Sequence, residues 1–94
     1  NFYYVKDNVI YTPRAKILAG VTRGIVLTLA APYYHIKQKR IYLDEVLLAD
    51  ECFLTQTSTG VVPVVGIEER PVGTSKPGAV TKHLIELFGE YTER

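Results

Sequence analysis

Two short runs of aromatic and β-branched residues near the start of the chain place the strongest limit on its fold. The runs are residues 2–5 and 9–12, and Asp7 and Asn8 lie between them. Aromatic and β-branched side chains favour strands, and Asp and Asn tolerate the left-handed backbone of a tight turn. The segment therefore predicts an antiparallel hairpin, whose second strand ends at Pro13.

Two later segments have apolar residues at helical spacing. Residues 21–31 predict a helix that Pro32 ends, and residues 79–91 predict an amphipathic helix. The first of these is apolar around most of its circumference, so we expect it to be well buried. Residues 43–49 predict a short helix with acidic residues in its first turn, where the helix dipole favours them.

Three further segments have an extended pattern. They cover residues 33–41, 51–55 and 61–67, and Pro63 indicates an edge or a bulge in the last of them. Hairpins mixed with separate helices predict an α+β fold, with a mixed sheet and two to three helices. Residues 1–94 are expected to form a single, partial domain.

Composition and charge indicate an ordinary globular chain. It is 47% hydrophobic and 22% charged, which argues against disorder. Eleven basic and ten acidic residues give a net charge of +1, so no imbalance points to nucleic acid or to an anionic membrane. The basic run 37–40 lacks interleaved aromatic residues and fits a solvated strand edge better than a phosphate-backbone patch.

Cysteine and histidine usage excludes several kinds of chemistry. Cys52 is the single cysteine, so no internal disulfide can form, and a cytoplasmic protein with a buried thiol is expected. His35 and His83 have no companions at metal-ligand spacing, so no metal site is expected. The chain begins at Asn1 and contains no methionine, from which we expect a piece of a longer protein.

A first candidate anion site lies at residues 19–23. Gly20 precedes the predicted helix, and Thr22 and Arg23 follow in its first turn. The N–H groups of a first helical turn are unpaired and carry partial positive charge, so they bind phosphate readily. Gly20 allows close approach and Thr22 offers a hydroxyl. Plain N-capping is the alternative interpretation.

A second candidate is the polar segment 55–60 between two apolar strands. Its hydroxyl and amide groups suit a second set of phosphate oxygens or a carboxylate, and a solvated loop is the alternative. Neither candidate has a catalytic group beside it. The six lysines lie in polar or turn-like settings, and no carboxylates form an acid–base pair.

The ordered set of motifs resembles the class IV aminotransferases, the pyridoxal-phosphate (PLP) enzymes of fold type IV. This family includes branched-chain aminotransferases, D-amino-acid aminotransferases and aminodeoxychorismate lyase. The similar segments are Asn1-Phe2 with residues 5–13 (the hairpin), 18–23 (L-x-G-I-T-R), 49–55 (A-D-E-x-F-x-T), 61–64, 70–73 and 76–81. The resemblance implies the C-terminal part of the large domain of the D-amino-acid aminotransferase-like fold.

The resemblance also implies roles for individual residues. Gly20, Val21 and Thr22 would bind the cofactor phosphate at the helix start, Thr57 would bind it from the second segment, and Leu18 would pack on the pyridine ring. Backbone N–H groups around Thr57 and Ser58 would receive the substrate carboxylate. The family's Schiff-base lysine and pyridine-nitrogen glutamate lie upstream of the position matching Asn1, so we expect no catalytic residue here and an inactive fragment.

The parent protein is expected to transfer an amino group between a branched-chain-like amino acid and a 2-oxo acid. The alternatives are a lyase like aminodeoxychorismate lyase and a non-catalytic module that binds a phosphorylated ligand or a partner. Gln56 stands where many branched-chain members of the family have glycine, and its side chain would crowd the side of the substrate carboxylate. The resemblance therefore implies the substrate class less strongly than the cofactor. Glu69 replaces the glycine of a D-G-R turn, which predicts a longer or bulged connection. A homodimer is expected, with an exposed apolar face where the missing N-terminal part and the dimer partner sit.

Overall fold

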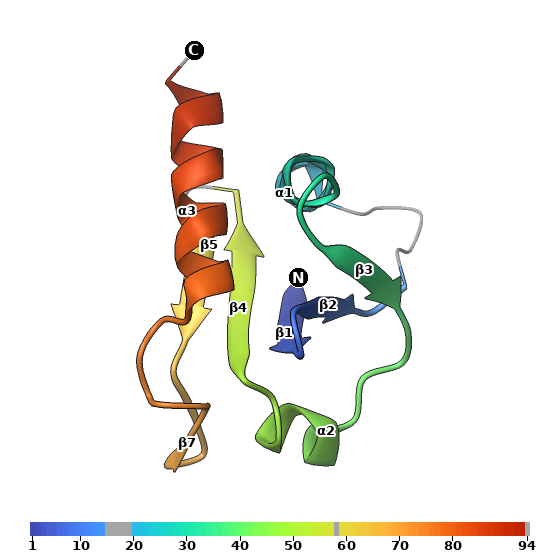
Figure 1. Cartoon of the computed structure of the whole chain (residues 1–94), viewed down its shortest axis with the longest axis vertical. Helices are drawn as coiled ribbons and strands as arrows, with labels where there is room; N and C mark the ends of the chain where they lie inside the picture. Colours follow the sequence, from blue (N-terminus) through green and yellow to red (C-terminus); the bar gives the residue numbers. More distant parts are fainter. Residues whose placement is uncertain (15–19, 58, 94) are drawn as a thin grey trace.

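The computed structural model describes residues 1–14, 20–57 and 59–93 of the chain (Figure 1). Within these residues the elements follow in the order β1 (Phe2–Lys6), β2 (Val9–Thr12), α1 (Val21–Ala30), β3 (His35–Gln38), α2 (Leu43–Leu47), β4 (Glu51–Gln56), β5 (Gly60–Val64), β6 (Gly66–Ile67), β7 (Arg70–Pro71) and α3 (Ala79–Thr92). The predicted α+β class, with a mixed sheet, hairpins and helices, is confirmed.

Five strands form one mixed sheet in the order β3-β2-β1-β4-β5. β3 is parallel to β2, and the other neighbours are antiparallel. β2, β3 and β4 therefore end at the same edge of the sheet, where β1 begins. β5 is the outer strand, which agrees with the edge position that Pro63 indicates, because proline cannot donate a ladder hydrogen bond.

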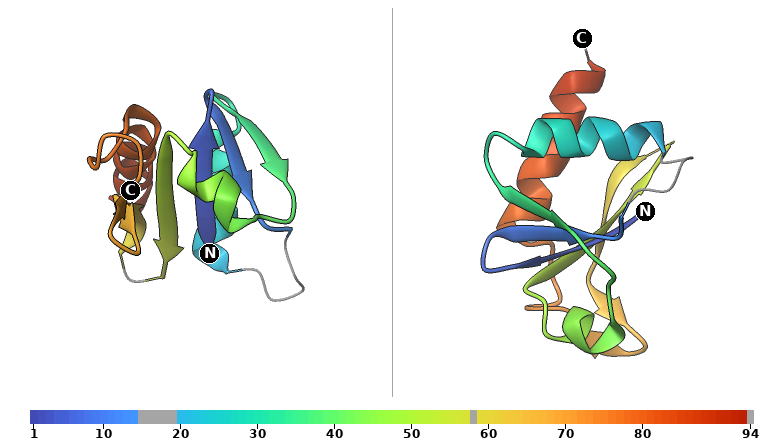
Figure 2. Two further views of the ribbon diagram at one scale, coloured as in Figure 1. Left: turned by 90° about the horizontal axis from the view of Figure 1, so that it is seen from below. Right: turned by 90° about the vertical axis from the view of Figure 1, so that its right-hand side faces the viewer.

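Alternate residues of the central strands face two different apolar clusters, as the two-residue repeat of a strand requires. On one face, α1 and α3 pack on the sheet. The buried residues of this cluster are Tyr3, Val5, Ile10, Val26, Ala30, Phe53, Val61, Val80 and Leu84. In Figure 2 both helices lie on this side of the strands.

The opposite face carries a smaller cluster around α2. Its buried residues are Tyr4, Val46, Ala49, Cys52 and Val72. Figure 1 shows α1 and α2 on opposite sides of β1 and β2. Both faces of the sheet are thus covered, while the edge where β2, β3 and β4 end is left for other contacts.

The β1–β2 hairpin has the predicted tight turn. Lys6 pairs with Val9, and the two residues between them, Asp7 and Asn8, have φ values of 52° and 63°. Two left-handed residues in a two-residue loop suit the twist of a hairpin. The Asp7 N–H also donates to Asp50 Oδ2 at 2.9 Å, which ties the turn to the start of β4.

The prediction that the first helix is well buried is wrong for this chain. Of α1, only Thr22, Arg23, Val26 and Ala30 are buried, whereas Val21 is 81% exposed. One face of the helix packs on the sheet and α3, and nothing in the described chain covers the other. Its end before Pro32 is confirmed.

The prediction of a longer or bulged connection at Glu69 is also wrong. Ile67 pairs directly with Arg70, so only Glu68 and Glu69 form the turn, with φ values of 49° and 66°. This is the same two-residue geometry as the first hairpin, adopted by two residues that disfavour it. The strand expected over 61–67 is interrupted at Val65, which lies between β5 and β6.

Replacing Glu69 by glycine should therefore stabilise the protein. Glycine adopts a positive φ without a steric cost, and this gain exceeds its extra chain entropy, so Glu69→Gly should raise the free energy of unfolding by about 0.5–1 kcal/mol. The matched control is Glu86→Gly in the right-handed backbone of α3, which should lower it by about 1 kcal/mol. Urea unfolding measures both, and a loss of stability in Glu69→Gly would contradict the turn geometry.

Candidate functional site

The two predicted anion-binding segments meet at one edge of the sheet, on either side of Asn1. The N-terminal amine of Asn1 donates to Thr55 O at 3.3 Å, and the Thr55 N–H donates to Asn1 O at 2.9 Å. A Cβ placed on Gly20 would lie 3.4 Å from Asn1 Nδ2. Asn1 is thus hydrogen-bonded to the end of β4 and lies close to the start of α1, and Figure 2 shows the start of the chain beside the start of α1.

The beginning of α1 has no side-chain cap. Gly20 is the N-cap residue, with extended backbone at φ −63° and ψ 146°, and no side chain makes the capping hydrogen bond. Gly20 O accepts from the Gly24 N–H at 3.2 Å, and the N–H groups of residues 21–23 have no acceptor within the helix, as in any first helical turn. No described side chain therefore caps the start of α1, in contrast to the alternative interpretation of this segment. Its first-turn N–H groups are hydrogen-bond donors of the kind that bind anions.

Nothing in the described chain requires glycine at position 20. Its φ is negative, and a Cβ would meet only Asn1, at an ordinary contact distance of 3.4 Å. A glycine adds no side chain beside the first-turn N–H groups, a donor set of the kind that suits phosphate.

The predicted site residues differ in how exposed they are. Gly20, Val21 and Thr57 are exposed, whereas Thr22 is 7% exposed and lies on the helix face toward the sheet. Leu18 and Ser58 lie outside the described residues. Gln56 is exposed, and its Oε1 accepts a hydrogen bond from the Thr59 hydroxyl at 3.0 Å, so its side chain folds onto its own turn.

The hydroxyl groups of Tyr3 and Thr55 form a buried pair at this edge of the sheet. Tyr3 Oη and Thr55 Oγ1 are 3.0 Å apart, and the Tyr3 ring stacks on Phe53 at 4.6 Å between centroids. Burial raises the pKa of the Tyr3 hydroxyl, while the hydrogen bond to Thr55 and the charge of Arg23 lower it. Thr55 is therefore fixed in both backbone and side chain, two residues before Thr57.

Asn1 and Tyr3 are the residues that motif reasoning missed. From the sequence, both were assigned to the hairpin, and neither was predicted to lie near the two candidate anion-binding segments. The antiparallel register of β1 with β4, in which Tyr3 lies opposite Phe53, brings them there. A run of β-branched and aromatic residues indicates a strand, but it does not say which strand is the neighbour.

The described lysines do not include a buried one. Lys6 pairs with Asp50 at 3.5 Å, and Lys39 donates to Glu45, which also accepts from Tyr4 Oη at 2.8 Å. The bonds from Lys39 and Tyr4 lower the pKa of Glu45. These are surface or half-buried structural pairs, so the described part of the chain offers no desolvated amine to act as a nucleophile.

The cysteine is buried, as predicted. Cys52 is 2% exposed on β4, facing the α2 cluster. Burial, and then the neighbouring Glu51 charge, raise the pKa of its thiol to about 11. The thiol is therefore protonated at neutral pH and is not a nucleophile.

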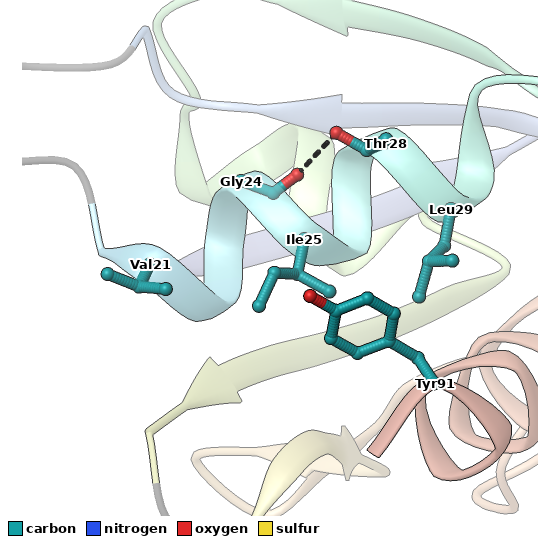
Figure 3. A pocket seen from close by; sticks show the side chains of 6 residues that line it. All are labelled: Val21, Gly24, Ile25, Thr28, Leu29 and Tyr91. Atoms are coloured by element: carbon teal, nitrogen blue, oxygen red, sulfur yellow. Dashed lines mark hydrogen bonds between the residues drawn. The ribbon is translucent and has the colours of Figure 1, made fainter. Parts of the chain in front are cut away.

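An apolar hollow lies on the uncovered side of α1. It has a volume of about 340 Å³ and is lined by Val21, Gly24, Ile25, Thr28 and Leu29, with Tyr91 of α3 opposite. Figure 3 shows the aliphatic side chains of α1 and the Tyr91 ring facing this space, and the Thr28 hydroxyl bonded to the Gly24 carbonyl at 2.8 Å. The resemblance predicts an exposed apolar face, and this hollow is an apolar surface of that kind among the described residues. No helix of the described chain has the length and apolar character that a membrane span needs.

The comparison with protein families agrees with the motifs. The class IV amino-transferase model matches residues 1–67, and the chain belongs to this family. A branched-chain-amino-acid aminotransferase of Pseudomonas aeruginosa is 43% identical over 90 residues, which cover 94% of this chain and 29% of that protein. A D-alanine aminotransferase of Bacillus licheniformis is 40% identical over 87 residues, which cover 89% of this chain and 31% of that protein.

Solved structures agree with the fold as well. A branched-chain amino acid aminotransferase from T.th., solved with pyridoxamine 5'-phosphate, matches with a TM-score of 0.90 at 36% identity, covering 96% of this chain and 31% of that one. An aminotransferase from Brucella abortus bound to the cofactor PLP matches with a TM-score of 0.89 at 28% identity, covering 100% and 34%. The chain thus spans about a third of the length of these relatives.

Proposed function

We propose that this chain is the phosphate-binding part of a PLP-dependent aminotransferase, whose reactive lysine and pyridine-nitrogen glutamate come from outside these 94 residues. The observation that carries the proposal is the start of α1 without a side-chain cap, close to Asn1, which is itself hydrogen-bonded to Thr55 of the Thr55–Thr57 segment. One phosphate between the two segments takes hydrogen bonds from both. Related aminotransferases have been solved with PLP or pyridoxamine 5'-phosphate, which supports the choice of ligand.

In this proposal the chain binds and orients, and it does not carry out the proton transfers. Val21 and Thr22 hold the phosphate at the helix start, Thr57 holds it from the other side, and Leu18 packs against the ring. Bound PLP supplies the aldehyde and the electron-withdrawing ring through which an amino group moves from an amino acid to a 2-oxo acid. The backbone around Thr57 and Ser58 receives the substrate carboxylate. A firmly held phosphate fixes where the reacting end of the cofactor lies.

The relatives favour amino transfer, because both a branched-chain and a D-alanine aminotransferase are similar to the chain. The 43% identity with the branched-chain enzyme supports branched-chain-like amino acids as the substrates. An elimination that releases pyruvate, as in aminodeoxychorismate lyase, would use the same phosphate site. Assaying the whole protein for pyruvate release and for amino transfer separates the two reactions. A cytoplasmic homodimer, in which the apolar face of α1 is covered, completes the proposal.

Removing either threonine hydroxyl should weaken phosphate binding. Pyridoxamine 5'-phosphate is a suitable probe, because it has no aldehyde to react with surface lysines. A hydrogen bond to a charged group contributes about 1.5–3 kcal/mol, so Thr22→Val and Thr57→Val should each lower its affinity about tenfold or more. Titration of the chain, followed by cofactor fluorescence, measures the affinity.

The matched control is Thr28→Val, also on α1, whose hydroxyl is bonded to Gly24 O and lies away from the helix start. It should leave the affinity unchanged. Pyridoxamine without the phosphate should bind weakly to all three variants and to the parent chain. Equal affinity for the two ligands in the parent chain would reject the phosphate site and leave a non-catalytic module that binds a partner.

A further inference from the structure

Arg23 is a buried cation in the first turn of α1. It is 5% exposed, and its Nη2 donates to Pro13 O at 2.9 Å. Among the described residues the ion pairs are Lys6 with Asp50 and Lys39 with Glu45, so no described carboxylate neutralises Arg23. Burying a charge without an opposite charge costs free energy. A neutral donor could make the hydrogen bond to Pro13 O, so that bond alone does not explain why a charged side chain is buried here.

Arg23 does not point toward the start of the helix, although a guanidinium one residue after Thr22 has the chemistry of a direct phosphate ligand. Arg23 instead turns inward, toward the end of β2, and is covered by the sheet and the helix. It therefore does not line the open approach beside Gly20.

The charge belongs to the first phosphate-binding segment and acts on a residue that supports the second. Arg23 directly follows Val21 and Thr22 in the chain, and its charge lowers the pKa of the Tyr3 hydroxyl against the larger effect of burial. The guanidinium is thus close enough to act on Tyr3, whose Oη is 3.0 Å from Thr55 Oγ1. Arg23 thus belongs to the first segment and acts electrostatically on Tyr3, which supports the second segment through Thr55.

We infer that Arg23 is a positioning residue, which acts through its buried charge to select the dianionic form of a phosphate at the start of α1, without touching it. This inference rests on the proposed function, because the phosphate is that of the cofactor. The first-turn N–H groups supply only about half a positive charge. A full charge held behind them in a low-dielectric interior adds to the attraction for a dianion.

The test compares a variant that loses the charge at position 23 with a variant that keeps it. Arg23→Gln removes the charge, and Arg23→Lys keeps it on a different donor. The purified chain is titrated with pyridoxamine 5'-phosphate and with pyridoxamine, and ³¹P NMR follows the pKa of the bound phosphate. Arg23→Gln should reduce the preference for the phosphorylated ligand about tenfold and raise the phosphate pKa by about 0.5–1 unit, and Arg23→Lys should change both much less.

A chemically synthesised chain with citrulline at position 23 keeps the test decisive if Arg23→Gln does not fold. Citrulline retains the N–H groups that reach Pro13 O but carries no charge, so it should behave as expected for Arg23→Gln. A parent-like ligand preference and phosphate pKa in the uncharged variant would overturn the role of Arg23 and leave the phosphate site intact. Equal binding of the two ligands by the parent chain would instead overturn the proposed function itself.

Discussion

Replacing Phe53 by alanine should remove about 3–5 kcal/mol from the free energy of unfolding, the largest loss we expect from a single change. Phe53 is fully buried, and its ring lies almost parallel to that of Tyr3, at an interplanar angle of 8°. The change removes the ring from the centre of the cluster that joins α1 and α3 to the sheet. A small domain has about 5–15 kcal/mol of stability, so much of it would be lost.

Urea unfolding followed by circular dichroism measures this loss. Leu48→Ala is the matched control, because Leu48 is 73% exposed and its truncation should cost no more than about 0.5 kcal/mol. The Phe53 variant should also bind pyridoxamine 5'-phosphate more weakly at temperatures where it remains folded, since Tyr3 loses its stacking partner below Thr55. Similar losses in the two variants would contradict a packed ring at position 53.

Much of the fold could be predicted because its signals are local. Asp7 and Asn8 specify a tight turn by their own tolerance of positive φ, and Pro32 ends a helix by its own ring. Glu68 and Glu69 show the limit of such reasoning. Their residue types disfavour the turn that they form, so the pairing of β6 with β7 overrides the local preference.

The sequence indicated the two segments of the candidate site, but it did not indicate how they lie relative to each other. The motifs identified the start of α1 and the Thr57 segment, but the role of Asn1 between them follows from the pairing of β1 with β4. The inward direction of Arg23 depends on where Pro13 lies, which its neighbours in sequence do not reveal. The same holds for the buried side of α1, because an almost wholly apolar helix gives no sign of which face remains uncovered.

The motif around β4 joins elements that are distant in the sequence. Asp50 binds the β1–β2 turn, Thr55 binds Tyr3, and Glu51 lies between them. Glu51 Oε1 accepts from the Thr81 N–H at 2.8 Å and from the Thr81 hydroxyl at 2.7 Å, and Oε2 accepts from the Val80 N–H at 3.2 Å. No side chain at the N-cap Gly78 caps α3, so Glu51 supplies the cap from another strand.

Glu51→Ala should therefore cost about 2–3 kcal/mol, because it removes a charged helix cap and leaves the Thr81 hydroxyl, on a buried residue, without this partner. Glu51→Gln keeps an acceptor without the charge and should lose about half as much. Glu86→Ala, on the exposed side of the same helix, is the control, with an expected change within about 0.5 kcal/mol.

Hydrogen exchange gives a second and more local measurement of the cap. The N–H groups of Val80 and Thr81 should exchange faster in Glu51→Ala than in Glu86→Ala, because they lose their acceptor. Burial and then the Glu51 charge raise the pKa of Tyr34, so the variant should also lower that pKa toward its usual value. If both exchange rates and the Tyr34 pKa stayed as in the parent chain, Glu51 would not be the cap, and α3 would be held on the sheet by its apolar face alone.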